Sequence, residues 1–249
     1  TSTRGHFDVK TRYLETIDEL NAQIPLDHFA GLFASIKVSP GEEQIGAEME
    51  ATLTARGFIG SIATQAWAHG QESHQSGYID DIACLYDRPY FAPHQYCLHL
   101  EDDFHLHAYD GDLLRQFAAA IDILQNNADI VQVRFPRFAN ERERILGLRT
   151  KHGIDGRVQD VDQRYFRTND FSFNPSVFRT RDIRLASDFF KRGGHSLPNH
   201  VEHGLGQVLK SLSRSPVPLA VLNPANVKAA HFGTVLGEED SLTEPVYAN

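Results

Sequence analysis

The sequence is poor in cysteine and lacks a long apolar run. Its 249 residues include only two cysteines, Cys84 and Cys97, which are too few for a disulfide framework and are not spaced as a zinc-binding Cys-x-x-Cys pair. No stretch approaches the roughly 18 apolar residues of a membrane-spanning helix, and no signal peptide opens the chain. These absences predict a reduced, cytoplasmic protein without a transmembrane segment.

Positive charge is also scarce. The chain has 24 Lys and Arg residues against 33 Asp and Glu residues, for a formal net charge of −9. A nucleic-acid-binding protein would normally carry a basic face or stripe. Here the basic residues are scattered, apart from the arginines between Arg134 and Arg149, which could serve a small phosphate group. We therefore expect no nucleic-acid partner. The 41% hydrophobic and 23% charged residues are ordinary for a soluble globular domain.

Helix-like and strand-like apolar patterns alternate along the first half of the chain. The predicted helices cover 9–24, 42–56, 77–86 and 112–124, and the predicted strands cover 31–38, 58–63, 96–100 and 129–134. Gly57 is expected to end the second helix. This alternation predicts an α/β fold in which helices flank a mostly parallel, Rossmann-like sheet with right-handed crossovers.

The second half has a weaker pattern. The charged segment 136–168 predicts a long loop, and loops of this length are usually functional or mobile. Helices are expected over 180–190 and 199–212, and a strand over 217–222 leads into a tail that contains His231.

The strongest local signal is an acidic triplet, Glu101-Asp102-Asp103, directly after the apolar strand 96–100. In open parallel sheets, ligands bind in the crevice beyond the carboxyl ends of the strands. Consecutive carboxylates at this place can hold a hard divalent cation, and such a cation stabilises the charge that develops on a departing diphosphate. A solvated acidic turn is the alternative. The position of the triplet before a helix N-cap predicted at Asp110 favours a cation site over a solvated turn.

The triplet resembles the Asp-x-Asp motif of the GT-A glycosyltransferases, in particular the family 2-like enzymes. The other segments that resemble this family are Thr3-Arg4 with the helix around 13–20 (first loop and helix), 34–40 (second strand and the turn that meets the nucleobase) and 169–176 (acceptor side). The likeness runs from about Arg4 to His231 and lies in the order of short motifs. It departs from the family in one respect: the apolar first strand should precede Thr3, where the chain has almost nothing.

The resemblance implies a GT-A domain that transfers a sugar from a nucleoside-diphosphate sugar to a hydroxyl of a glycan or glycolipid acceptor. We expect a single domain over 1–249, with a nucleotide-sugar-binding half over about 1–110 and an acceptor-side half over about 111–249. Tandem domains of this kind occur in polysaccharide-building enzymes, so the abrupt start at Thr1 would suit an excised part of a larger multidomain chain.

The resemblance also implies roles for individual residues. Asp103 and the late histidine His231 would hold the divalent metal, Mn²⁺ or Mg²⁺, and an imidazole ligand suits Mn²⁺ better. The residues expected to bind the nucleotide sugar are Thr3, Arg4, Ser39, Asp81, Glu101 and Asp102. For His231, an ordinary surface or core histidine is the alternative.

An inverting transfer needs a general base that takes the proton of the acceptor hydroxyl. The expected base is Glu202, because inverting GT-A enzymes place a carboxylate at such a helix start. A helix N-terminus stabilises the ionised carboxylate and so makes it a weaker base. A helix-capping acid is therefore the alternative role of Glu202.

The sequence leaves three other functions open. A retaining transferase on the same fold would differ only in where Glu202 lies relative to the anomeric carbon. A metal-dependent hydrolase would use the Glu101–Asp103 region with His99, His105 and His107, and would bind zinc without a nucleotide. A carbohydrate-binding or scaffold domain would have no activity at all.

Overall fold

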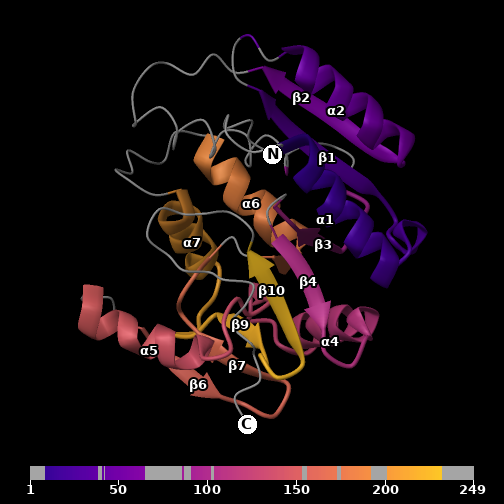
Figure 1. Cartoon of the computed structure of the whole chain (residues 1–249). Helices are drawn as coiled ribbons and strands as arrows, with labels where there is room; N and C mark the ends of the chain where they lie inside the picture. The colour runs from indigo at the N-terminus through magenta and orange to yellow at the C-terminus, as the bar shows by residue number, and fades with distance from the viewer. Residues whose placement is uncertain are drawn as a thin grey trace.

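The structure is a computed structural model. It describes residues 9–38, 41, 43–64, 86, 91–101, 104–152, 156–172, 175–191 and 201–231. These residues form an α/β fold with a mixed central sheet and flanking helices (Figure 1). The fold class predicted from the alternating pattern is therefore confirmed. No helix among these residues is long and apolar enough to cross a membrane.

The central sheet has six strands in the order β3-β8-β5-β9-β7-β6. Their bounds are β3 Tyr96–His99, β5 Gln132–Arg134, β6 Val158–Asp160, β7 Tyr165–Thr168, β8 Ser176–Arg179 and β9 Leu219–Leu222. The β5–β9 pair is parallel, and the other neighbouring pairs are antiparallel. Following these pairings, β3, β5, β9 and β6 run in one direction, while β8 and β7 are reversed. Most strands thus share one direction, as predicted, but the two reversed strands lie between them.

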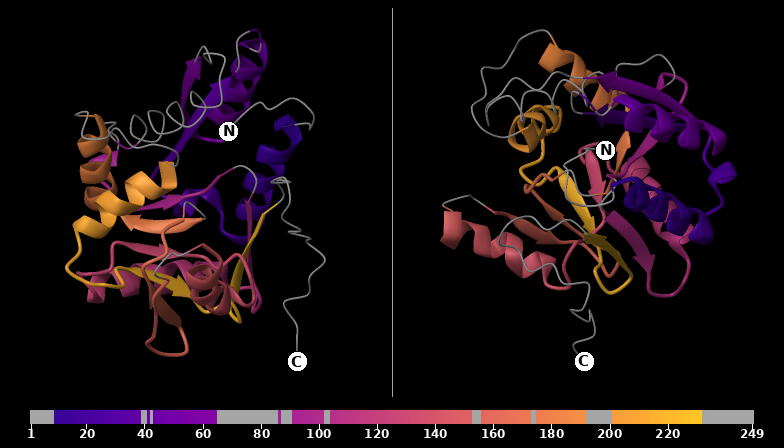
Figure 2. Two further views of the ribbon diagram at one scale, coloured as in Figure 1. Left: turned by 90° about the vertical axis from the view of Figure 1, so that its left-hand side faces the viewer. Right: turned by 45° about the horizontal axis from the view of Figure 1, so that its top comes forward.

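Helices cover both faces of this sheet. The helices are α4 (Leu113–Asn126), α5 (Glu141–His152), α6 (Thr180–Lys191) and α7 (Val201–Ser211). Val177 of β8 packs in the core cluster of α4, whereas the next residue, Phe178, packs in the cluster of α6 and α7. Successive strand residues point to opposite faces, so β8 needs apolar residues at both positions. Figure 2 shows α6 and α7 side by side, away from α4.

The N-cap of α4 corrects one prediction. The cap is Asp112 and not Asp110: the Asp112 carboxylate accepts the backbone N–H of Arg115 at 2.9 Å. Asp110 lies before the cap, where its carboxylate accepts the backbone N–H of Asp112 at 3.0 Å. Two acids two residues apart look alike in the sequence, and the turn at Gly111, with φ of 74°, decides which one caps the helix.

The N-terminal part contains a parallel β-α-β unit, as predicted. It consists of β1 (Leu32–Val38), α2 (Glu43–Ala55) and β2 (Phe58–Thr64), and β1 pairs with β2 in register from Leu32 and Phe58 onward. Gly57 follows α2 with φ of 87°, the left-handed conformation that a glycine C-cap adopts. Helix α1 (Val9–Gln23) packs Tyr13 and Ile17 against this unit.

One long-range strand pairing was not predicted. Strand β4 (Phe104–Ala108) pairs in antiparallel fashion with β10 (Val227–His231), so the end of the chain's described part returns to the acidic triplet (Figure 1). The prediction of a tail around His231 is therefore wrong. Strand β4 alternates apolar Phe104 and Leu106 with polar His105 and His107, and this period of two in residue type is the sequence signal of a strand.

The predicted loop over 136–168 is also wrong, because this segment holds α5 and the β6–β7 hairpin. Helix α5 is charged nearly all round and buries Ile145 against Phe166 and Val221. One apolar anchor is too weak a pattern to indicate a helix. The predicted helix 77–86 lies outside the described residues except for Tyr86.

Candidate functional site

Most of the predicted ligand-binding residues lie outside the part of the chain that the structure describes. These residues are Thr3, Arg4, Ser39, Asp81, Asp102 and Asp103. The structure does describe the side chain of Glu101, which is half-buried, and the backbone positions of Glu202 and His231. The described surroundings of the triplet therefore define the candidate site.

The acidic triplet leaves the sheet at an edge where strand ends meet. In β3, His99 pairs with Ser176, and Ser176 also pairs with Arg134 at the end of β5. These three residues form one row across the sheet. Glu101 follows His99 by two residues, so it lies just beyond the carboxyl ends of β3 and β5. This is the side of an α/β sheet on which ligands bind.

A buried pair lies beneath the triplet. The Tyr86 hydroxyl and Nδ1 of His99 share a hydrogen bond of 2.7 Å, and both residues are buried. Burial lowers the pKa of His99 to about 4. Burial also raises the pKa of Tyr86 far above its usual value, with smaller contributions from Cys97 and Glu101. Both groups are neutral near pH 7, so the pair anchors β3 and does not offset the negative charge of the triplet.

The pairing of β4 with β10 places the backbone of His231 beside Phe104, the residue that follows the triplet in the sequence. His231 is the last residue of β10 and pairs with Phe104, the residue directly after Asp103. Backbone positions that pair across antiparallel strands have Cα atoms about 4.5–5.5 Å apart. Two residues that the sequence separates by more than half the chain thus have neighbouring backbone positions. Asp103 lies outside the described residues, and of His231 only the backbone position is described, so the two predicted metal ligands stay a prediction.

A buried ion network holds the opposite side of this edge. The Arg134 side chain is 1% exposed, and its Nη2 donates to Oε1 of Glu141 at 2.8 Å. Its Nη1 lies 3.3 Å from Oδ2 of Asp170. Gln132, in the same strand, donates to the backbone carbonyl of Ser172 at 2.7 Å. These contacts fix the segment 169–172 against the end of β5.

The same segment lies against α7. A Cβ atom built on Gly206 would be 2.7 Å from the ring of Phe171, so only glycine allows this approach. Burial lowers the pKa of Lys210, one turn further along α7, while the nearby Asp170 opposes this shift. Asp170 therefore faces cations from both β5 and α7.

The arginines after β5 are engaged within the protein. Arg142 forms two hydrogen bonds with Asp160, and its guanidinium is exposed. Arg144 stacks over the ring of Phe138 at 3.5 Å. With Arg134 in the buried network, three of the arginines that could have served a phosphate have other contacts.

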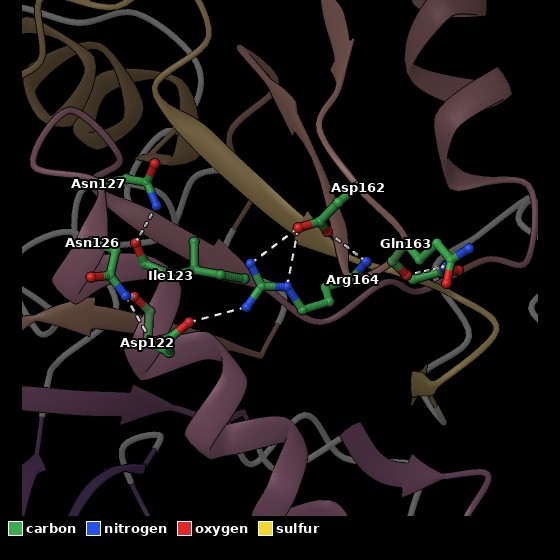
Figure 3. A network of polar contacts seen from close by, with 8 residues as sticks. Asp122, Ile123, Asn126, Asn127, Asp162, Gln163 and Arg164 are labelled. Carbon is green, nitrogen blue, oxygen red and sulfur yellow. Dashed lines mark hydrogen bonds and ion pairs between the residues drawn. The ribbon is translucent and has the colours of Figure 1, made fainter.

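An exposed polar network lies at the far end of α4. Arg164 bridges Asp122 of α4 at 3.1 Å and Asp162 at 3.0 Å (Figure 3). Its neighbours Asn126 and Asn127 donate to backbone carbonyls of the same helix, and Asn127 reaches the carbonyl of Ile123 at 2.8 Å. Exposed ion pairs of this kind contribute little to stability, so this network is a surface feature.

A second group of ligand-type side chains joins β4 to α1, and the sequence pattern did not indicate the part that α1 plays in it. Glu19, His105 and His107 bring ligand atoms within 4.8 Å of one another. Nδ1 of buried His105 contacts Oε2 of Glu19. Burial lowers the pKa of His105 to about 4, helped by His107, so the contact joins a neutral ring to the carboxylate. Burial also raises the pKa of Glu19, against the opposing effect of His107.

Comparisons with known proteins do not assign a family. No family model matches the chain, and curated proteins give no match. Among solved structures, the chain is similar to the crystal structure of 4-diphosphocytidyl-2C-methyl-D-erythritol synthase from Anaerococcus prevotii DSM 20548. The alignment has 11% sequence identity and a TM-score of 0.41, and it covers 90% of this chain and 81% of that chain. A similarity this low carries no conclusion about activity.

Proposed function

We propose that the chain is a metal-dependent glycosyltransferase of the GT-A type. It moves a sugar from a nucleoside-diphosphate sugar to a hydroxyl of a glycan or glycolipid acceptor, with inversion at the anomeric carbon. The observation that carries this proposal is the register of β4 and β10, which pairs His231 with Phe104 beside Asp103. Phe104 directly follows the acidic triplet in the sequence, so this register supports a metal site built from the triplet and His231.

The donor set fits a divalent cation. In this proposal, Asp103 supplies a carboxylate oxygen and His231 an imidazole nitrogen, a combination that suits Mn²⁺. The bound cation would stabilise the negative charge that develops on the departing nucleoside diphosphate. Glu101 and Asp102 would hold the nucleotide from the same turn. Thr3, Arg4, Ser39 and Asp81 complete the proposed donor site.

Glu202 is the proposed general base, and its backbone position supports this role. It is the second residue of α7, one turn before Gly206. Residues four apart share a helix face, so position 202 lies on the face that approaches Phe171. This face is turned towards the segment 169–172, which is anchored to the end of β5. An acceptor bound between α7 and the sheet edge would meet a carboxylate there.

Titration calorimetry with UDP and dTDP, with and without Mn²⁺, tests the donor site. We expect Mn²⁺-dependent binding to the wild type, loss of binding in Asp103→Ala, and unchanged binding in the control Asp27→Asn, whose carboxylate is 90% exposed elsewhere. Glu202→Gln should keep nucleotide binding and lose transfer. The absence of diphosphate binding under every condition would refute the proposal. The anomeric configuration of the product then distinguishes inversion from retention.

A further inference from the structure

Helix α1 and strand β4 bring together three metal-binding side chains that the proposed donor site does not use. His105 and His107 are two residues apart in β4 and therefore share one face of the strand. Glu19 reaches them from α1, and the ligand atoms of the three residues lie within 4.8 Å of one another. Phe104 and Leu106, which alternate with the histidines, are buried in the core.

The position of α1 over this face is fixed by other contacts. Gln23, one turn after Glu19, donates from its side-chain amide to the backbone carbonyl of Leu106 at 2.6 Å. Ile24, directly after the helix, is 1% exposed and packs in the same core cluster as Phe104 and Leu106. Glu19 is therefore held over β4 by a docked helix, and its approach to His105 does not depend on that contact alone.

We propose that Glu19, His105 and His107 form a binding site for a divalent cation of the zinc type. Two imidazoles and one carboxylate are a donor set that zinc favours, and three protein ligands leave a fourth position for water. Zinc–nitrogen and zinc–oxygen bonds are about 2.0–2.2 Å long, so tetrahedral ligand atoms lie roughly 3.4 Å apart. The cluster reaches this spacing by small side-chain rotations, because Glu19 and His107 are both exposed.

The surrounding charges set the strength of the site. Lys228 of β10 pairs with His107 and so adds a positive charge on the neighbouring strand. Glu15 lies one turn before Glu19 on α1 and adds a negative charge. Ala230 pairs with His105 and adds no charge. A bound cation would add a further link between α1 and β4 to the Glu19–His105 contact and the Gln23–Leu106 hydrogen bond.

Zinc binding to the full chain tests the proposal, measured by competition with a chromogenic chelator and by the visible absorption of Co²⁺. His107→Gln is the main variant, because His107 is exposed and its replacement leaves the core intact. We expect His107→Gln and Glu19→Gln each to weaken zinc binding by more than about tenfold. Lys228→Gln should strengthen it several-fold, by roughly the loss of one nearby positive charge.

Two controls distinguish zinc bound at this cluster from zinc bound elsewhere on the chain. His28→Gln removes another exposed histidine next to a carboxylate, with Nδ1 3.7 Å from Asp27, and should bind zinc as the wild type does. The double variant Asp103→Asn with His231→Gln removes the proposed donor-site ligands and should keep this zinc site. Equal zinc binding in wild type, His107→Gln and Glu19→Gln would overturn the proposal. So would loss of zinc binding in the Asp103 and His231 double variant alone.

Discussion

Removing Glu141 should destabilise the protein strongly, because it leaves the buried charge of Arg134 without its nearest partner. Arg134 is 1% exposed and Glu141 is 7% exposed at the side chain, and their atoms meet at 2.8 Å. The second carboxylate oxygen of Glu141 also accepts the backbone N–H of Phe138 at 3.1 Å. Glu141→Ala therefore removes the nearest counter-charge of Arg134 and one capping contact at the start of α5.

The expected loss of unfolding free energy follows from the burial of this ion pair. Breaking a buried ion pair by removing one partner typically costs about 3–5 kcal/mol. Asp170 remains 3.3 Å from Arg134, and its side chain is 27% exposed, so it compensates in part. We expect Glu141→Ala to lower the free energy of unfolding by about 3 kcal/mol. Asp170→Asn removes the longer, more exposed contact and should cost about 1 kcal/mol.

Urea unfolding followed by far-ultraviolet circular dichroism measures both changes. The decisive variant is the double replacement Arg134→Met with Glu141→Leu, which removes the charge together with its partner. It should be at least about 1 kcal/mol more stable than the sum of the losses measured for its own single variants, Arg134→Met and Glu141→Leu, predicts. If the losses of Arg134→Met and Glu141→Leu simply add in the double variant, or if Glu141→Ala costs less than about 1 kcal/mol, Arg134 and Glu141 do not form a coupled buried pair.

Three further changes have defined outcomes. Burial holds the pKa of His99 at about 4 in the folded protein, whereas the unfolded chain protonates it below about pH 6.5, so His99 alone should lower the stability by about 2 kcal/mol from pH 7.5 to pH 5. Buried His105 has a pKa lowered in the same direction and adds to the fall. In urea unfolding, His99→Gln should therefore make the slope of stability against pH shallower without removing it. Gly206→Ala would ordinarily stabilise a helix by about 1 kcal/mol, but the contact with Phe171 should make it destabilising in thermal unfolding, and Phe171→Leu should relieve the loss. Asp112→Ala should cost about 1 kcal/mol by removing the N-cap of α4, and an unchanged melting temperature would contradict that role.

Local patterns explain why much of the secondary structure was predictable. Helix α4 buries Leu113, Phe117 and Leu124 at helical spacing, and the predicted helix 112–124 agrees with it. Strand β9 agrees with the predicted strand 217–222, and the structure buries it at every position. Helix α5 escaped prediction because Ile145 is the one buried apolar residue among its described side chains, so no apolar stripe marked it.

The candidate site was predictable only in part, because sequence patterns report on neighbouring residues and not on distant partners. The triplet after β3 was visible because the apolar strand and the acids adjoin in the sequence. The pairing of His231 with Phe104 joins two strands that lie about half the chain apart in the sequence. The His105 contact with Glu19 likewise joins β4 to a helix far earlier in the sequence. Periodicity carries no information about such partners.

The sequence by itself determined the α/β alternation, the glycine that ends α2 and the acidic residues that follow β3, since each follows from residues a few positions apart. The tertiary structure alone decided which strands are reversed, that Arg134 is a buried ion rather than a surface charge, and which histidines meet a carboxylate. Backbone preference and hydrophobic spacing act locally, whereas burial of a charge depends on partners that only the folded chain brings within bonding distance.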